Sequence, residues 1–232
     1  MTSRLRGSIL LFLVAGFAPS LGAAGDDGFV SLFNGKDLTG WEGDARLWSV
    51  RDGAITGQTT KQNPDRGNTF LIYKGGDVSD FELRVTCRIV GGNSGIQYRS
   101  KITDPKQWVL HGYQADFGPG DSHNGKLYDE GGKRGAIASP GQKVVVRPDG
   151  RKDVASASGD PQAIRKGIAD NEWYEYVVVA RGNHLVHTIN GQVMTDTVDG
   201  DKNAFTSGVL GLQIHAGEPM TVQFKDVRLK KL

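Results

Sequence analysis

The sequence contains a single cysteine, Cys87, among its 232 residues. One cysteine cannot form a disulfide within the chain, so the fold must be held together by the burial of apolar side chains. Cys87 alternates in step with Leu83, Val85 and Ile89. This pattern predicts a buried and unreactive thiol on the inner face of a strand.

The sequence also lacks a membrane-spanning run and a charge of one sign. Residues 1–24 carry Arg4 and Arg6, then an apolar run of 11 residues, then small residues before Ala24. Such a segment is typical of a secretory signal, and the run is shorter than the roughly 20 residues that a membrane span needs. We therefore expect cleavage after Ala24 and export to the periplasm or the extracellular space.

The remaining 208 residues, 25–232, have 26 basic and 26 acidic side chains, because both charges of the signal are basic. This balance argues against a nucleic-acid-binding surface driven by bulk charge. The length suits one domain, and no linker or internal repeat divides it.

Proline is scarce, with 8 residues, whereas glycine is abundant, with 33. Strict apolar-polar alternation or apolar runs between glycine-containing turns predict β-strands at four clear places: 81–89, 172–180, 209–216 and 220–229. Short strands with many tight turns favour an all-β fold, an antiparallel β-sandwich or jelly roll. One short helix is expected at 161–166, within a long loop over 148–171.

Several chemical motifs are absent. There is no Glu-x-Asp-x-x-Glu strand of a retaining glucanase, no Gly-x-Ser-x-Gly elbow and no phosphate-binding loop. The five histidines do not form a metal-binding motif, although three could still meet in space. Asp116, Asp129 or Glu130 could bind a calcium ion, but none lies in a recognisable calcium loop.

Polar residues on one parity interrupt three apolar strands. Because residues two apart in a strand share a face, three pairs are expected to point the same way: Gln97 with Arg99, Gln114 with Asp116, and Gln213 with His215. If these strands are neighbours, the pairs form a floor suited to sugar hydroxyl groups. The alternative is a solvated outer face, although such faces favour Lys, Glu and Thr. Trp108, near a loop, is the expected sugar-stacking ring.

The chain resembles the 3-keto-disaccharide hydrolase domain family. The resemblance rests on motifs spread over nearly all of residues 25–232: Leu32–Trp41, Gly92–Arg99, Gly112–Asp116, His187–Gly191 and Gly208–Lys225. It implies a concanavalin A-like β-sandwich, exported by bacteria, that acts on 3-keto-glycosides. Many members have Glu-x-Gln where this chain has Gln114-x-Asp116. That difference leaves Asp116 open as a base, a hydroxyl clamp or a cation ligand.

The implied reaction begins with removal of the C2 proton, which the ketone at C3 makes acidic, and continues with expulsion of the group on C1. His215 or Asp116 is the expected base, and Arg99 is expected to stabilise the enolate. The expected substrate-binding residues are Gln97, Gln114, Gln213, Asn93, Trp108, Tyr128 and Glu130. No cofactor is required by the sequence, and a divalent cation remains an option.

Two other function classes stay open. A non-catalytic carbohydrate-binding module shares this kind of fold, but it would need aromatic platforms rather than titratable groups. A structural or adhesion domain would tolerate alanine at every residue of the polar floor. The expected partners are a small sugar substrate and an upstream sugar 3-dehydrogenase that supplies the ketone, with no nucleic acid and no membrane span.

Overall fold

The computed structural model describes residues 28–232, apart from residue 66 and residues 121–122 and 158–170. The expected signal, 1–24, and the expected helix, 161–166, lie outside the described residues. Within the described part every regular element is a strand, as predicted. No helix there is long and apolar enough to cross a membrane.

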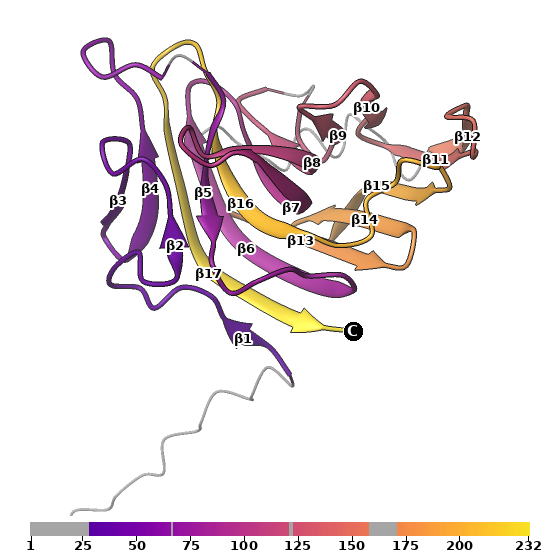
Figure 1. Cartoon of the computed structure of the whole chain (residues 1–232), viewed down its shortest axis with the longest axis horizontal. Coiled ribbons are helices and arrows are strands. Elements are labelled where there is room, and N and C mark those ends of the chain that lie inside the picture. Colours follow the sequence, from indigo (N-terminus) through magenta and orange to yellow (C-terminus); the bar gives the residue numbers. More distant parts are fainter. Residues whose placement is uncertain (1–27, 66, 121–122, 158–170) are drawn as a thin grey trace, which may run out of the picture.

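Ten strands form the larger sheet (Figure 1). In spatial order they are β12 (Lys152–Ala157), β11 (Gln142–Val146), β15 (Gln192–Asp199), β14 (His184–Ile189), β13 (Tyr174–Arg181), β6 (Phe81–Val90), β17 (Thr221–Lys231), β4 (Ala54–Gln58) and β3 (Trp48–Arg51), with β1 (Val30–Ser31) pairing to β17. The pairing of β11 with β15 is parallel, so the sheet is mixed rather than purely antiparallel.

Seven strands form the second sheet, and all of its pairings are antiparallel. In spatial order they are β10 (Gly135–Ala138), β9 (Leu127–Glu130), β8 (Val109–Phe117), β7 (Ser94–Asp104), β16 (Val209–Ile214), β5 (Thr69–Tyr73) and β2 (Trp41–Glu42). The two sheets pack face to face, which is the predicted sandwich (Figure 1).

The core lies between the sheets. Strand β6 contributes every second side chain, including Leu83, Val85 and Cys87, and all of these are buried. Burying one such side chain contributes about 1.5–3 kcal/mol, so this alternation is what fixes the strand's face. Burial also raises the pKa of the Cys87 thiol far above its usual value. The predicted burial of this thiol is confirmed.

The four predicted strands correspond to β6, β13, β16 and β17, and β13 lies inside the larger sheet between β14 and β6. The long-loop prediction for 148–171 is wrong in one part. Residues 152–157 form β12, which pairs with β11 in a hairpin around the turn at 147–151. The sequence did not predict this strand at the edge of the sheet because the segment contains many polar residues.

The hairpin of β7 and β8 bends back over the outer face of the seven-stranded sheet, the face turned away from the core. The Phe70 amide donates to the Trp108 carbonyl over 3.0 Å, and the Thr69 hydroxyl donates to the Gln107 carbonyl over 3.0 Å. Leu110 packs there with Phe70 and Ile72 in an apolar cluster separate from the main core. Because the hairpin covers only part of the outer face, the part over β8 and β9 stays open and forms a pocket.

Candidate functional site

The strand register brings the expected polar side chains to one face. Gln97 of β7 lies opposite Gln114 of β8, and Gln114 lies opposite Tyr128 of β9. Gln213 of β16 lies opposite Phe70 on the same outer face. Alternate residues of these strands, such as Ile96, Ala115 and Leu212, belong to the core instead. The period of two therefore predicts this face correctly for all three glutamines.

A pocket of about 430 Å³ opens on this face. Six of the predicted site residues line it: Asn93, Gln114, Asp116, Tyr128, Glu130 and His215. The remaining lining comes from Asn68, His123, Lys126, Asp129, Gly131 and Gly132. Strands β8 and β9, the loop between them and the residue after β16 thus build one cavity from distant parts of the chain.

A chain of hydrogen bonds runs beneath the pocket and ends at Asp116. The Ser100 hydroxyl donates to Gln97 Oε1, Gln97 Nε2 donates to Gln114 Oε1 over 3.2 Å, and Gln114 Nε2 donates to Asp116 Oδ1 over 2.6 Å. Gln114 Nε2 also reaches Gln213 Oε1, at 3.3 Å. Every link orients the next, so the chain fixes the Asp116 carboxyl in one position.

Gln97 and Gln213 are fully buried and do not line the pocket, which corrects their expected contact with substrate. They lie behind Gln114 and support it. Gln213 Nε2 is buried without a hydrogen-bond partner among the described residues.

Asp116 is nearly buried at the base of the pocket. Burial raises the pKa of its carboxyl to about 7, against the lowering effects of the Gln114 hydrogen bond and the Lys126 charge. The charge of Glu130 adds to the rise. A carboxyl with a pKa near 7 can both give and take a proton at neutral pH, which is what general acid-base catalysis requires.

His215 lies at the rim of the pocket and is exposed. Its Nδ1 is 2.6 Å from the Ala216 carbonyl oxygen, and the Ala216 amide donates to Asn68 Oδ1 over 3.0 Å. Because a carbonyl can only accept, Nδ1 carries the proton of the neutral ring. Nε2 then holds a free lone pair that a substrate can reach.

His123 and Lys126 are site residues that the strand patterns did not reveal. Lys126 Nζ lies 3.3 Å from His123 Nδ1, so the ammonium donates and Nε2 of the neutral ring carries the proton. Partial burial, followed by the charges of Lys126 and His215, lowers the pKa of His123. Both residues lie in the connection between β8 and β9, where no periodicity marks a face.

Arg99 does not line the pocket, which corrects the prediction that it stabilises the enolate. The strand bulges here: Arg99 has φ = 48°, and the β7–β8 register shifts between Tyr98 and Lys101. The side chain is buried elsewhere, donating to the carbonyls of Ser79 and Gly182 over 2.6 Å each and to Asp80 Oδ1 over 2.9 Å. Lys126 is the cation that lines the pocket instead.

Trp108 is also absent from the pocket lining, contrary to its expected role as a stacking ring. It belongs to the turn of the bent hairpin and packs against the apolar cluster of Phe70, Ile72 and Leu110. The glycines of the polar face have a related role. A Cβ at Gly211 would lie 2.5 Å from Leu110 Cδ1, and one at Gly95 would collide with Gln114. They make room for protein side chains rather than for a ligand.

The described residues do not fit a metal site. Among them, no group of three or more His, Cys, Asp or Glu side chains is placed to hold one ion. Asp129, an expected calcium ligand, instead accepts hydrogen bonds from the Arg134 backbone amide at 3.1 Å and from Arg134 Nε at 3.3 Å.

The two packed sheets, with a polar pocket on the outer face of the smaller one, define a jelly-roll β-sandwich. The chain belongs to the family of 3-keto-alpha-glucoside-1,2-lyase-like domains, whose profile matches residues 28–230. A 3-keto-disaccharide hydrolase from Bacteroides thetaiotaomicron is 33% identical over 90 residues. That match covers 34% of this chain and 30% of the relative, so the chain aligns with under a third of that protein.

Solved structures share the fold. A candidate glycosyl hydrolase from Parabacteroides distasonis has a TM-score of 0.59 at 24% identity, covering 89% of this chain and 94% of that one. The carbohydrate-binding module CBM66 from Bacillus subtilis has a TM-score of 0.54 at 17% identity, covering 83% and 96%. A β-glucanase from Bacillus licheniformis has a TM-score of 0.50 at 13% identity, covering 88% and 97%. Catalytic and binding proteins both use this sandwich.

Proposed function

We propose that the protein cleaves 3-keto-glycosides by removing the C2 proton and eliminating the group on C1. One observation carries the proposal: a single pocket combines the free Nε2 lone pair of His215, the Asp116 carboxyl with a pKa of about 7, and the ammonium of Lys126. An elimination beside a ketone needs a base, an acid and a positive charge for the enolate oxygen.

In the first step His215 Nε2 takes the C2 proton. The electron pair of the broken C2–H bond forms the enolate, whose oxygen at C3 is stabilised by Lys126. In the second step the carbonyl re-forms, a C1–C2 double bond appears and the C1–O bond breaks. The protonated Asp116 donates its proton to the departing oxygen. Water adding across the double bond then yields the free 3-keto sugar, and the net reaction is hydrolysis.

Family membership and the hydrolase relative support this substrate class. The ketone must be made beforehand by oxidation at C3, so the proposal includes an upstream sugar 3-dehydrogenase. The proposal also includes export, which the leader-like residues 1–24 support. A mature N-terminus at residue 25 in the periplasmic or secreted fraction is the expected result, and an uncleaved chain in the cytoplasmic fraction would contradict it.

A carbohydrate-binding module without catalysis is the second candidate, favoured by the structural likeness to CBM66. Its weakness is the composition of the pocket. The lining is rich in titratable side chains, and Tyr128 is its only Phe, Trp or Tyr among the described residues. Sugar-binding modules draw most of their affinity from exposed aromatic rings.

The test follows aglycone release from 4-nitrophenyl 3-keto-glucoside and from the unoxidised glucoside, with and without EDTA. We expect release from the keto form alone, and we expect His215→Ala to lower it by about 100-fold or more. His184→Ala is the matched control, since His184 is exposed, paired with Asp196 and absent from the pocket lining. Saturable binding of the sugar without aglycone release would support the binding module. Loss of aglycone release in the presence of EDTA would show that the reaction needs a divalent cation.

A further inference from the structure

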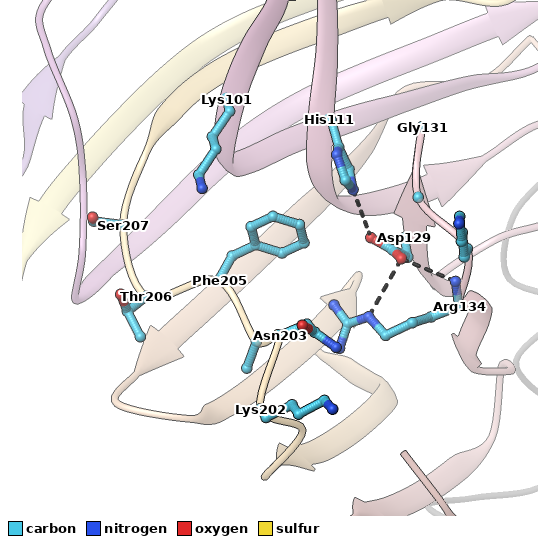
Figure 2. A pocket seen from close by; sticks show the side chains of 13 residues that line it. Lys101, His111, Asp129, Gly131, Arg134, Lys202, Asn203, Phe205, Thr206 and Ser207 are labelled. Carbon is cyan, nitrogen blue, oxygen red and sulfur yellow. Dashed lines mark hydrogen bonds and ion pairs between the residues drawn. The ribbon is translucent and has the colours of Figure 1, made fainter. Parts of the chain in front are cut away.

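A second pocket has a volume of about 790 Å³, and Figure 2 shows the side chains that line it. The two pockets share Asp129, Gly131 and Gly132, so the end of β9 and its turn form the partition between them. The rest of the lining comes from the β7–β8 hairpin, the residues before β10 and the segment before β16: Lys101, His111, Lys133, Arg134, Lys202, Asn203, Ala204, Phe205, Thr206 and Ser207.

The second pocket carries an excess of positive charge. Lys101, Lys133 and Lys202 are exposed at its edge, and none of their ammonium groups has an ion pair among the described residues. The two nearby acids, Asp129 and Asp199, both contact a fourth cation, Arg134, so four positive charges face two negative ones. Arg134 Nη1 donates to the buried Asp199 over 2.7 Å, and Arg134 Nε lies 3.3 Å from Asp129 Oδ2. Three unpaired cations around one cavity favour an anionic ligand.

The interior of this pocket is held rigidly. The Tyr113 hydroxyl donates to Asp199 Oδ2 over 2.5 Å, so the same carboxylate fixes both Tyr113 and the Arg134 guanidinium. Arg134 is mostly buried, and its Nη2 has no hydrogen-bond partner among the described residues. The Arg134 guanidinium is therefore a fixed positive charge in the lining of the pocket.

The Phe205 ring supplies an apolar surface next to these charges (Figure 2). It is half-buried, with its ring centroid 5.2 Å from that of His111 and 5.2 Å from that of Tyr113, both in edge-to-face contact. Thr206 and Ser207 lie next to it with hydroxyl groups. An aromatic face with hydroxyls and a guanidinium matches a sugar ring that bears an oxyanion, rather than a free inorganic ion.

We propose that the second pocket binds an acidic sugar unit, one that carries a carboxylate, sulfate or phosphate group. This unit is attached to the sugar held in the first pocket. The inference rests on the proposed function and adds to it a substrate class: acidic glycosides rather than neutral ones. The shared partition of Asp129, Gly131 and Gly132 places the two sugars as neighbours.

The test is calorimetric titration of the purified protein with cellobiouronic acid and with cellobiose at low salt. We expect the acidic disaccharide to bind about tenfold or more tightly than the neutral one, and the difference to vanish at high salt. The triple variant K101A/K133A/K202A should lose this preference. The triple variant K36A/K61A/K231A removes the same charge from exposed lysines outside both pockets, and it should keep the preference.

Further arms separate the sources of the anion. Methyl glucuronide, glucose 6-sulfate and glucose 6-phosphate should each compete, whereas inorganic phosphate should compete at least about tenfold less well. Equal affinity for the acidic and neutral disaccharides, or equal loss in the two triple variants, would overturn the inference. Turnover of a neutral 3-keto-glucoside is measured separately, so a failed anion preference and a failed proposed function give different results.

Discussion

At the scale of single residues, the ionisation of the Asp116 carboxyl affects both the stability of the fold and the proposed catalysis. Burial raises its pKa from its usual value near 3.8 to about 7, so the folded protein keeps a proton that the unfolded chain releases between those values. The unfolded state thus binds fewer protons in this window, and stability falls as pH rises from about 4 to about 7. Above that range the loss is complete and constant.

Asp116→Asn removes the titrating carboxyl and with it this pH-dependent loss of stability. The asparagine keeps a side-chain oxygen that can accept a hydrogen bond from Gln114 Nε2. We expect the variant to gain up to about 4 kcal/mol in the free energy of unfolding at pH 8, and almost nothing at pH 4. Urea unfolding at the two pH values measures the gain. The same variant should release nitrophenol normally but fail on alkyl aglycones, which need a proton to leave. An equal loss of stability at both pH values would contradict the raised pKa.

Lys126 lowers the pKa of Asp116 and, in the proposed reaction, stabilises the enolate. Lys126→Met should therefore reduce kcat for a 3-keto-glucoside by about 100-fold or more. It should also shift the alkaline limb of the pH-rate profile upward, because the Asp116 carboxyl then keeps its proton to higher pH. A lower kcat with an unmoved alkaline limb would show that the two groups are not coupled.

At the scale of elements, Arg99 joins the bulge in β7 to three loops. Its buried guanidinium bonds to Ser79 and Asp80 before β6, to Gly182 after β13 and to Phe205 before β16. Arg99→Lys cannot make these fork-shaped contacts and should lower the free energy of unfolding by about 3 kcal/mol or more. Turnover per folded molecule should stay within about twofold. A loss of turnover without a loss of stability would restore Arg99 to the catalytic site.

Gly211 allows the β7–β8 hairpin to lie on β16. Gly211→Ala places a methyl group 2.5 Å from Leu110 Cδ1, and we expect a loss of about 1–3 kcal/mol in the free energy of unfolding. Leu110→Ala leaves a cavity that the new methyl group can partly fill, so the two losses should not add. Additive losses measured in the double variant would mean that the hairpin lies elsewhere.

The surroundings of Arg99 and Gly211 also show how much of the structure could be predicted from the sequence. Alternation predicted the sandwich and the outward face of Gln97, Gln114, Asp116 and Gln213, because a period of two survives along any regular strand. It failed at Arg99, since one bulged residue reverses the parity that follows it. The cover formed by Leu110 depends on a hairpin bending across the sheet, and no local pattern encodes that contact.

At the scale of the whole molecule, the larger sheet holds the pocket of the smaller one in place. His187 of β14 and Thr195 of β15 both lie against the Gly125 carbonyl, at 3.2 and 3.1 Å, next to Lys126. Burial lowers the pKa of His187 to about 4, so the neutral ring can donate from Nδ1 to that carbonyl and accept from the Tyr98 hydroxyl at Nε2. The loop that carries His123 and Lys126 is positioned by these contacts through the core.

The central claim is that a C2 proton is removed before the C1–O bond breaks. Incubating the protein with a 3-keto-glucoside in D₂O and reading C2 of the released sugar by NMR tests it most directly. Because His215 is exposed, its acquired proton exchanges with solvent. The account predicts deuterium at C2 with the unaltered protein and none with His215→Ala. Release of the aglycone with the original hydrogen still on C2 would contradict it.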